Sequence, residues 1–325
     1  MRHAHLTNAR RWSIGLVVAA GLGAGVLAGP RQTMPDLGRD GLVRVTVAVE
    51  RDDGAPVKGL LHEDFELLSD GQARPIDYFS SADEPVALVL LFDVTASMSG
   101  SGCDELPPMD EAVEGALLPR HTPRDRIRVG GLARELVLSP RFETDWPDLR
   151  RAVRLVWSIP SVDRLGPSPL WDGVETAVTA LQTEPGRRAI VMVTDGRATG
   201  NVHGMGDVTG HAIAADVAVC IVAVPTGMFL KQDKTTAARV RPYVLLEQMA
   251  GATGGSYSEL RTFEDLKPLL ARSISRLHEL YTIGFPPVAL DGRSHDLVVR
   301  VKRPGAKVRA KAGYVAGVPR KIPLG

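Results

Sequence analysis

The sequence predicts an α/β protein: a doubly wound, mostly parallel, Rossmann-like sheet with flanking helices, plus a small β-rich unit formed from the N- and C-terminal segments. Two observations support this fold class. Continuous apolar runs alternate with helical patterns in the middle of the chain, as in a parallel sheet covered on both faces. On either side of that stretch, short segments alternate apolar and polar residues, as half-buried antiparallel strands do.

Composition sets the outer limits on function. The chain has 325 residues, of which 44% are hydrophobic and 24% charged, which excludes a disordered, collagen-like or coiled-coil protein. Lys and Arg number 39 against 38 Asp and Glu, so no general positive field draws the protein to nucleic acid. The 2 cysteines are too few for a disulfide scaffold or a four-thiolate zinc site.

The first residues are typical of an export signal. Residues 1–28 combine a basic stretch, the apolar run Ile14–Leu27 and small residues up to Ala28, so we expect a cleaved signal peptide. The apolar run is shorter than the roughly 20 residues of a bilayer span. We therefore expect an exported protein (periplasmic, cell-surface or secreted) with no membrane span in its mature form; an uncleaved N-terminal anchor is the alternative. Export permits a disulfide between Cys103 and Cys220, although a buried thiol is the commoner state in an apolar strand.

Residues 40–82 predict an N-terminal β-unit. Val43–Val49 alternates apolar and polar residues, and Val57–Leu60 follows as a second short strand. Phe65–Leu68 and Ile76–Phe79 lie on either side of an Asp-Gly turn and predict a hairpin.

Residues 84–280 predict the α/β domain. Three apolar runs predict buried parallel strands, at Val86–Phe92, Ala189–Val193 and Val217–Val224. Helical patterns occupy Asp148–Trp157, Leu170–Leu181, Tyr243–Ala250 and Thr262–Leu280. Ile127–Leu132 and Glu135–Leu138 predict a short antiparallel pair at the sheet edge.

Residues 281–316 return to the β pattern. The expected strands are Tyr281–Phe285, His295–Val301 and Val308–Ala310. Three strands are too few for an independently stable unit. We therefore expect them to pair with the N-terminal β-unit, which makes the α/β domain an insertion between the two.

Oxygen-bearing side chains gather where the predicted buried strands end. Ligands bind at the carboxyl edge of such sheets, and carboxylate and hydroxyl oxygens suit Mg²⁺, Mn²⁺ or Ca²⁺ rather than zinc or copper. The candidate ligands are Asp93, Thr95, Ser97, Ser168 and Asp195, with Asp172 as a further candidate.

These residues form three motifs that resemble those of von Willebrand factor type A domains. Asp93-x-Thr95-x-Ser97 is similar to the Asp-x-Ser-x-Ser motif that opens the metal-ion-dependent adhesion site of that family. The segment from Ser168 to Gly173 resembles the second motif, with Ser168 where a Thr usually stands. Thr194-Asp195-Gly196 resembles the third. Thr95 and Ser168 depart from the family pattern but keep its hydroxyl groups.

The resemblance covers about residues 40–316 and extends to a bacterial exported subgroup of the family. It is carried outside the α/β domain by Gly59-x-x-x-x-Asp64-Phe65-Glu66-x-x-x-Asp70-Gly71, Tyr281-x-Ile283-Gly284-Phe285, Val299-x-Val301-Lys302-Arg303-Pro304-Gly305 and Ala312-Gly313-Tyr314. It implies a non-enzymatic adhesion or protein-interaction module. The implied partner is a protein with an exposed Asp or Glu, bound through a divalent cation, Mg²⁺ first and Mn²⁺ or Ca²⁺ as alternatives.

Two other functions stay open on the sequence. A metal-dependent hydrolase could use the same Asp and Ser cluster, but the motifs contain no His or Lys to serve as a general base. A metal-free scaffold is the third hypothesis, in which Asp93 only caps a helix and Asp172 is a first-turn acid favoured by the helix dipole. Thr194 fits a structural role as well as a ligating one.

Overall fold

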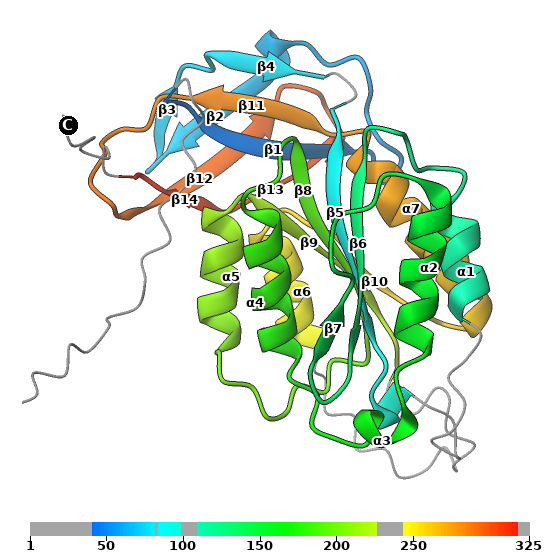
Figure 1. The fold of residues 1–325 in the computed structure, drawn as a ribbon. Helices are drawn as coiled ribbons and strands as arrows, with labels where there is room; N and C mark the ends of the chain where they lie inside the picture. Colours follow the sequence, from blue (N-terminus) through cyan, green and yellow to red (C-terminus); the bar gives the residue numbers. More distant parts are fainter. Residues whose placement is uncertain (1–40, 82–83, 99–108, 226–242, 318–325) are drawn as a thin grey trace, which may run out of the picture. The chain divides into compact units, whose positions relative to one another are not determined.

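The computed structural model describes residues 41–81, 84–98, 109–225 and 243–317, and it confirms the predicted fold class. These residues form one six-stranded, mostly parallel sheet with helices on both faces and two four-stranded antiparallel sheets (Figure 1). The expected signal peptide, residues 1–28, lies outside the described residues, as does Cys103. Cys220 is buried and forms no disulfide with a described residue.

The six-stranded sheet has the strand order β10-β9-β8-β5-β6-β7. Its strands are β5 (Val86–Asp93), β6 (Arg126–Leu132), β7 (Leu136–Leu138), β8 (Arg187–Thr194), β9 (Val217–Ala223) and β10 (Tyr257–Glu259). All neighbours are parallel except β7, which pairs antiparallel with β6. Every residue of β5 and β9 is buried, which explains why both strands appear in the sequence as unbroken apolar runs.

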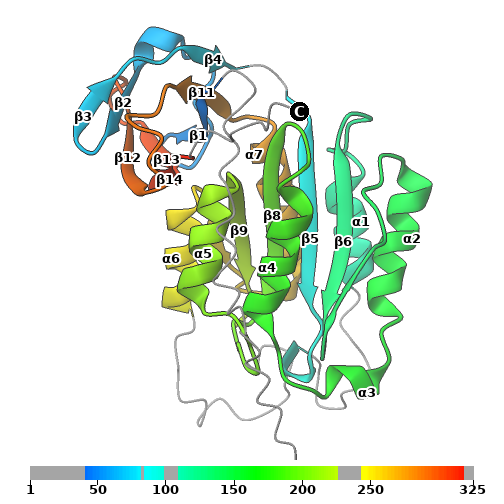
Figure 2. The same cartoon turned by 60° about the vertical axis from the view of Figure 1, so that its left-hand side comes forward.

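Helices cover both faces of this sheet (Figures 1 and 2). Alternate side chains of β5 pack into two separate apolar cores, one on each face. The helices are α1 (Met109–Leu117), α2 (Trp146–Trp157) and α7 (Leu266–Leu277) on one face, α4 (Leu170–Leu181), α5 (Met205–Ala214) and α6 (Tyr243–Ala252) on the other, and the short α3 (Ser161–Arg164). Among the described residues, no helix is long and apolar enough to cross a lipid bilayer.

Strands from both ends of the chain make the two antiparallel sheets, ordered β13-β1-β11-β4 and β14-β12-β2-β3. Their strands are β1 (Val43–Glu50), β2 (Phe65–Ser69), β3 (Gln72–Arg74), β4 (Tyr78–Ser80), β11 (Tyr281–Phe285), β12 (Ser294–Val301), β13 (Lys307–Ala310) and β14 (Gly313–Val315). β11 and β13 flank β1, and β12 pairs with β2. Apolar side chains of both sheets share one buried core. Three single turns of 3₁₀ helix complete the structure, at His62–Asp64, Ala96–Met98 and Phe263–Asp265.

The N-terminal unit differs from the expected hairpin. Asp70 and Gly71 both adopt positive φ, 49° and 77°, so the chain reverses within two residues and β2 pairs with β3 instead of residues 76–79. The segment 57–60 forms no strand, because Gly59 has a positive φ of 73° that interrupts an extended chain.

Three differences concern the α/β domain. Helix α5 is not among the predicted helices. It contains two glycines, Gly206 and Gly210, and Val208 and Ala212 supply the buried face that propensity alone does not. The predicted helix 262–280 begins instead with a 3₁₀ turn and ends at Leu277. Helix α1 and strand β10 carry patterns too short to stand out in the sequence.

Candidate metal centre

The candidate ligands lie around the carboxyl end of β5, at the point where the connections of the sheet reverse. β5 has β6 on one side and β8 on the other, and both neighbours follow it in the chain. Phe92 pairs with Val193, so Asp93 and Thr194 leave the sheet side by side. Such a switch point leaves a crevice outside the strand ends, where ligands of doubly wound sheets bind.

Local hydrogen bonds hold the Asp93 carboxylate in place. Its Oδ1 accepts from the backbone N–H of Thr95 at 3.1 Å and from the Thr95 hydroxyl at 2.6 Å. Its Oδ2 accepts from the Thr194 hydroxyl at 2.8 Å, and Thr194 Oγ1 in turn accepts from the N–H of Gly196 at 2.9 Å. The first and third motifs are therefore bonded to one another directly.

The hydroxyl of Ser97 lies beside that of Thr95, with 3.1 Å between Thr95 Oγ1 and Ser97 Oγ. Ser97 also favours the charged form of the Asp195 carboxylate. Asp195 Oδ1 accepts from the N–H of Arg197 at 3.1 Å. Its Oδ2 is buried and has no hydrogen-bond partner.

Ser168, just before α4, is attached to the loop that follows Asp195. Its N–H donates to Thr199 Oγ1 at 2.9 Å, and the Thr199 N–H donates to its carbonyl at 2.8 Å. The Ser168 side chain is buried, and its Oγ has no hydrogen-bond partner. A buried hydroxyl without a partner carries a desolvation cost unless something binds it.

Both carboxylates are held in an environment that opposes their charge. Burial, followed by repulsion from Asp195, raises the pKa of Asp93 to about 6, although Thr95 and Thr194 hydrogen-bond to its charged form. Burial also raises the pKa of Asp195, against the hydrogen bonds from Arg197 and Ser97. A cation placed between the two carboxylates would stabilise their charged forms.

Asp172 makes a different set of contacts. Its two carboxylate oxygens accept from the backbone N–H of Val202 and of His203, and Nδ1 of the His203 ring lies 2.8 Å from Oδ1. Burial opposes the charged form, but these hydrogen bonds outweigh it and hold the pKa of Asp172 below its usual value. The structure thus connects the Asp172 carboxylate to the 202–203 segment, and within the described ranges that carboxylate forms no hydrogen bond to another candidate ligand.

The donor set that remains fits a hard divalent cation. Two buried carboxylates lie with the hydroxyls of Thr95 and Ser97, and the two buried oxygen atoms without partners, Ser168 Oγ and Asp195 Oδ2, are of the kind that Mg²⁺ or Ca²⁺ coordinates. Within the described residues, no three His, Cys, Asp or Glu side chains gather closely enough to hold an ion. Metal binding here would therefore depend on the hydroxyl groups.

Two supporting residues were not found from the sequence. Thr199 positions Ser168 through the pair of hydrogen bonds described above, and Asn201 Oδ1 accepts from the N–H of Trp171 at 2.7 Å in the first turn of α4. Thr199 and Asn201 lie in an irregular loop about 30 residues after their partners, and no local sequence pattern predicts such a contact.

No protein-family model and no curated protein matches this chain. Solved structures do resemble it, and they include von Willebrand factor type A domains, the family that the three motifs resemble. The conserved hypothetical protein BatB from Bacteroides thetaiotaomicron is 17% identical, with a TM-score of 0.42 over 59% of this chain and 98% of that one. The SpRpn10 VWA domain is 14% identical, with a TM-score of 0.43 over 59% and 97%.

A third similar structure is proximal thread matrix protein 1 from the mussel byssus, described with a zinc-occupied MIDAS motif. It is 13% identical, with a TM-score of 0.46 over 64% of this chain and 49% of that one. At these identities and TM-scores the likeness is one of fold, and the function of this chain has to be argued from its own residues.

Proposed function

We propose that this protein is an exported interaction module that binds an acidic side chain of a partner protein through a divalent cation. The cation would be held by Asp93, Thr95, Ser97, Ser168 and Asp195, with Mg²⁺ as the first candidate and Mn²⁺ or Ca²⁺ as alternatives. The observation that carries the proposal is the pair of buried, partnerless oxygen atoms, Ser168 Oγ and Asp195 Oδ2, beside a carboxylate whose pKa is raised to about 6.

The chain's own groups account for the binding chemistry. Thr95 and Thr194 orient the Asp93 carboxylate in the metal-free protein. Binding an ion would therefore cost little conformational entropy at this side chain. Hydroxyl ligands are neutral, so the site contributes only two negative charges to a doubly charged ion. A cation bound there would stay electrophilic enough to accept an oxygen of a partner's carboxylate.

We favour binding over catalysis because the three motifs hold no His or Lys that could serve as a general base or activate a nucleophile beside the two carboxylates. His203, which follows the third motif, already has its Nδ1 against the Asp172 carboxylate.

Thermal unfolding of the full-length chain tests the metal site. The protein is unfolded in EDTA and then with Mg²⁺, Mn²⁺ or Ca²⁺ at increasing concentration. An ion present at 100 times its dissociation constant adds about 2.7 kcal/mol to the free energy of unfolding. For a chain of this size that corresponds to a rise of roughly 5–11 °C in Tm.

The variants identify where the ion binds. Asp93→Ala should abolish the rise, whereas Asp207→Ala, which removes an exposed carboxylate in the first turn of α5, should keep it. Asp172→Asn should also keep most of the rise if that side chain only fixes the 202–203 segment. Should no ion raise the Tm of the unmodified protein, the metal mechanism is wrong and a scaffold role becomes the better hypothesis.

A further inference from the structure

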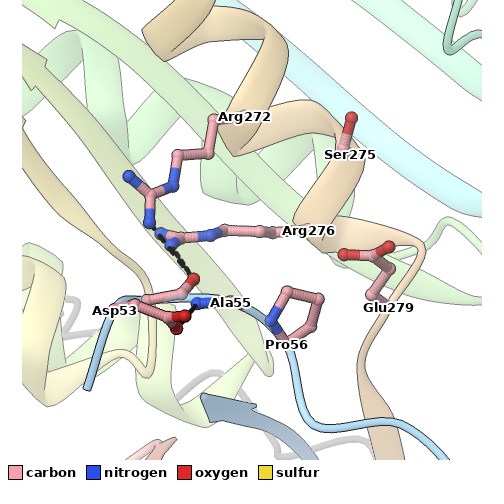
Figure 3. A pocket seen from close by; sticks show the side chains of 8 residues that line it. Asp53, Ala55, Pro56, Arg272, Ser275, Arg276 and Glu279 are labelled. Atoms are coloured by element: carbon pink, nitrogen blue, oxygen red, sulfur yellow. Dashed lines mark hydrogen bonds between the residues drawn. The ribbon is translucent and has the colours of Figure 1, made fainter. Parts of the chain in front are cut away.

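A pocket far from the strand ends of the candidate metal centre lies between α7 and the turn that follows β1. It has a volume of about 380 Å³ and is lined by one face of α7, by Glu279 just after that helix and by residues 53–56. Ser275 and Arg276 follow Arg272 by three and four residues, so all three side chains lie on one side of α7. Figure 3 shows the guanidinium groups of Arg272 and Arg276 pointing toward the turn.

Both guanidinium groups meet one backbone carbonyl. Nη2 of Arg272 donates to the Gly54 oxygen at 3.1 Å, and Nη2 of Arg276 donates to the same oxygen at 2.7 Å. Gly54 has a positive φ of 73°, and a Cβ there would collide with the Arg272 guanidinium. A larger residue would strain this backbone and displace the Arg272 guanidinium, so glycine favours the approach of the turn to the two arginines.

Positive charge around this carbonyl is not neutralised within the described residues. Arg276 pairs with Glu50 at 3.1 Å, but Glu50 is already held by both terminal nitrogens of Arg309. Arg272 forms no ion pair with any described residue. Nor does Arg120, whose Nε donates to the Ser275 hydroxyl at 2.7 Å. Arg276 and Arg309 thus share the single carboxylate of Glu50, and Arg272 adds a further positive charge that acts on Arg276.

The two other carboxylates that line the pocket have cations of their own. Glu279 lies 2.7 Å from the ammonium group of Lys58, and Asp53 pairs with Arg51 at 3.6 Å. They offset little of the charge of the arginines on α7. Burial, partly compensated by Glu50, lowers the pKa of Arg276, in keeping with a crowded cationic site.

We propose that this pocket binds the phosphate group of a small organic ligand, with Arg272 and Arg276 as its principal contacts. Guanidinium N–H groups that the Gly54 carbonyl does not use can donate in pairs to phosphate oxygens, an arrangement that arginine favours. A doubly charged group suits the excess of two positive charges that Arg272, Arg276 and Arg309 leave beside Glu50 better than a single carboxylate does. The pocket is larger than a phosphate ion needs, and Ala55 and Pro56 offer an apolar wall to the rest of the ligand.

Inorganic phosphate is the probe, added to the full-length chain in EDTA with chloride adjusted to constant ionic strength. The Tm is followed against phosphate concentration, because a specific site gives a saturable rise whereas the general stabilising effect of phosphate does not saturate. Arg272→Gln should move the half-saturating concentration at least about tenfold, the usual loss for one charge-assisted hydrogen bond. Arg272→Lys keeps the positive charge but loses the paired N–H donors of the guanidinium group. Its half-saturating phosphate concentration should lie between those of the unmodified protein and Arg272→Gln.

Arg300→Gln is the matched control, because it removes an exposed arginine on β12 that does not line the pocket. It should leave the phosphate curve unchanged. A curve without saturation, or the same curve for Arg272→Gln and for the control, would overturn the proposal. If acetate gave the same saturable rise in Tm at the same concentrations as phosphate, the phosphate assignment would be overturned in favour of a carboxylate site.

Discussion

Replacing Asp93 with Asn should make the metal-free protein more stable at neutral pH. Asn keeps the shape of the side chain, and its amide oxygen can still accept the hydrogen bonds from Thr95. What disappears is a buried negative charge, in a place where burial and Asp195 raise the pKa of the carboxyl to about 6. The same substitution removes a predicted metal ligand, so metal-free and metal-bound proteins should respond in opposite directions.

The magnitude follows from the shift in pKa. A native pKa of about 6 against an unfolded value of 3.8 corresponds to ~3 kcal/mol. Because the native pKa is raised, the contribution of Asp93 to stability is fully present below pH 3.8 and is lost as pH rises through 6. Above that pH the Asn variant avoids the loss. Its weaker bond to Thr194 costs about 1 kcal/mol, which leaves a net gain of roughly 2 kcal/mol.

Urea unfolding of both proteins in EDTA at pH 7.5 and at pH 4.5 measures this difference. Comparing the two proteins at each pH cancels the titration of every other group. The advantage of the variant should be present at pH 7.5, shrink or reverse at pH 4.5, and vanish at pH 7.5 once a binding divalent ion is added. A variant that is less stable than the unmodified protein in EDTA at pH 7.5 would refute the reasoning.

Three further predictions concern the rest of the structure. Lys311 and Asp216 form a buried ion pair at 2.9 Å, so Lys311→Met should lower the free energy of unfolding by about 3–5 kcal/mol in urea denaturation, and adding Asp216→Asn should recover part of that loss. The hydrogen bond to Asp70 raises the pKa of His295. The protonated ring therefore stabilises the fold fully below pH 6.5, and this contribution is lost as pH rises through the raised pKa. In urea unfolding, His295→Gln should flatten the fall in the midpoint between pH 6 and 8.5. Gly186 has a φ of 80° and no room for a Cβ beside a backbone carbonyl, so Gly186→Ala should lower Tm by several degrees in thermal unfolding, for a cost of ~1–3 kcal/mol.

Local patterns in the sequence predicted the buried strands well, because burial on both faces leaves an unbroken apolar run. β5 and β9 show this directly, since all their residues are buried. Short elements with weaker patterns were not predicted. Helix α5 is one of them, because the side chains that stabilise it lie in other elements. The 57–60 segment shows the opposite error, where apolar residues suggested a strand that the backbone of Gly59 interrupts.

The order and spacing of the three motifs were enough to name the candidate ligands, because hydroxyl and carboxylate positions after buried strands are local features. Only the tertiary structure could show which polar atoms remain without partners. Ser168 is held by Thr199 and the Asp172 carboxylate by residues 202–203, each about 30 residues away in the chain. Arg272 meets Gly54 across 218 residues. Such contacts depend on how elements dock, which periodicity and composition do not encode.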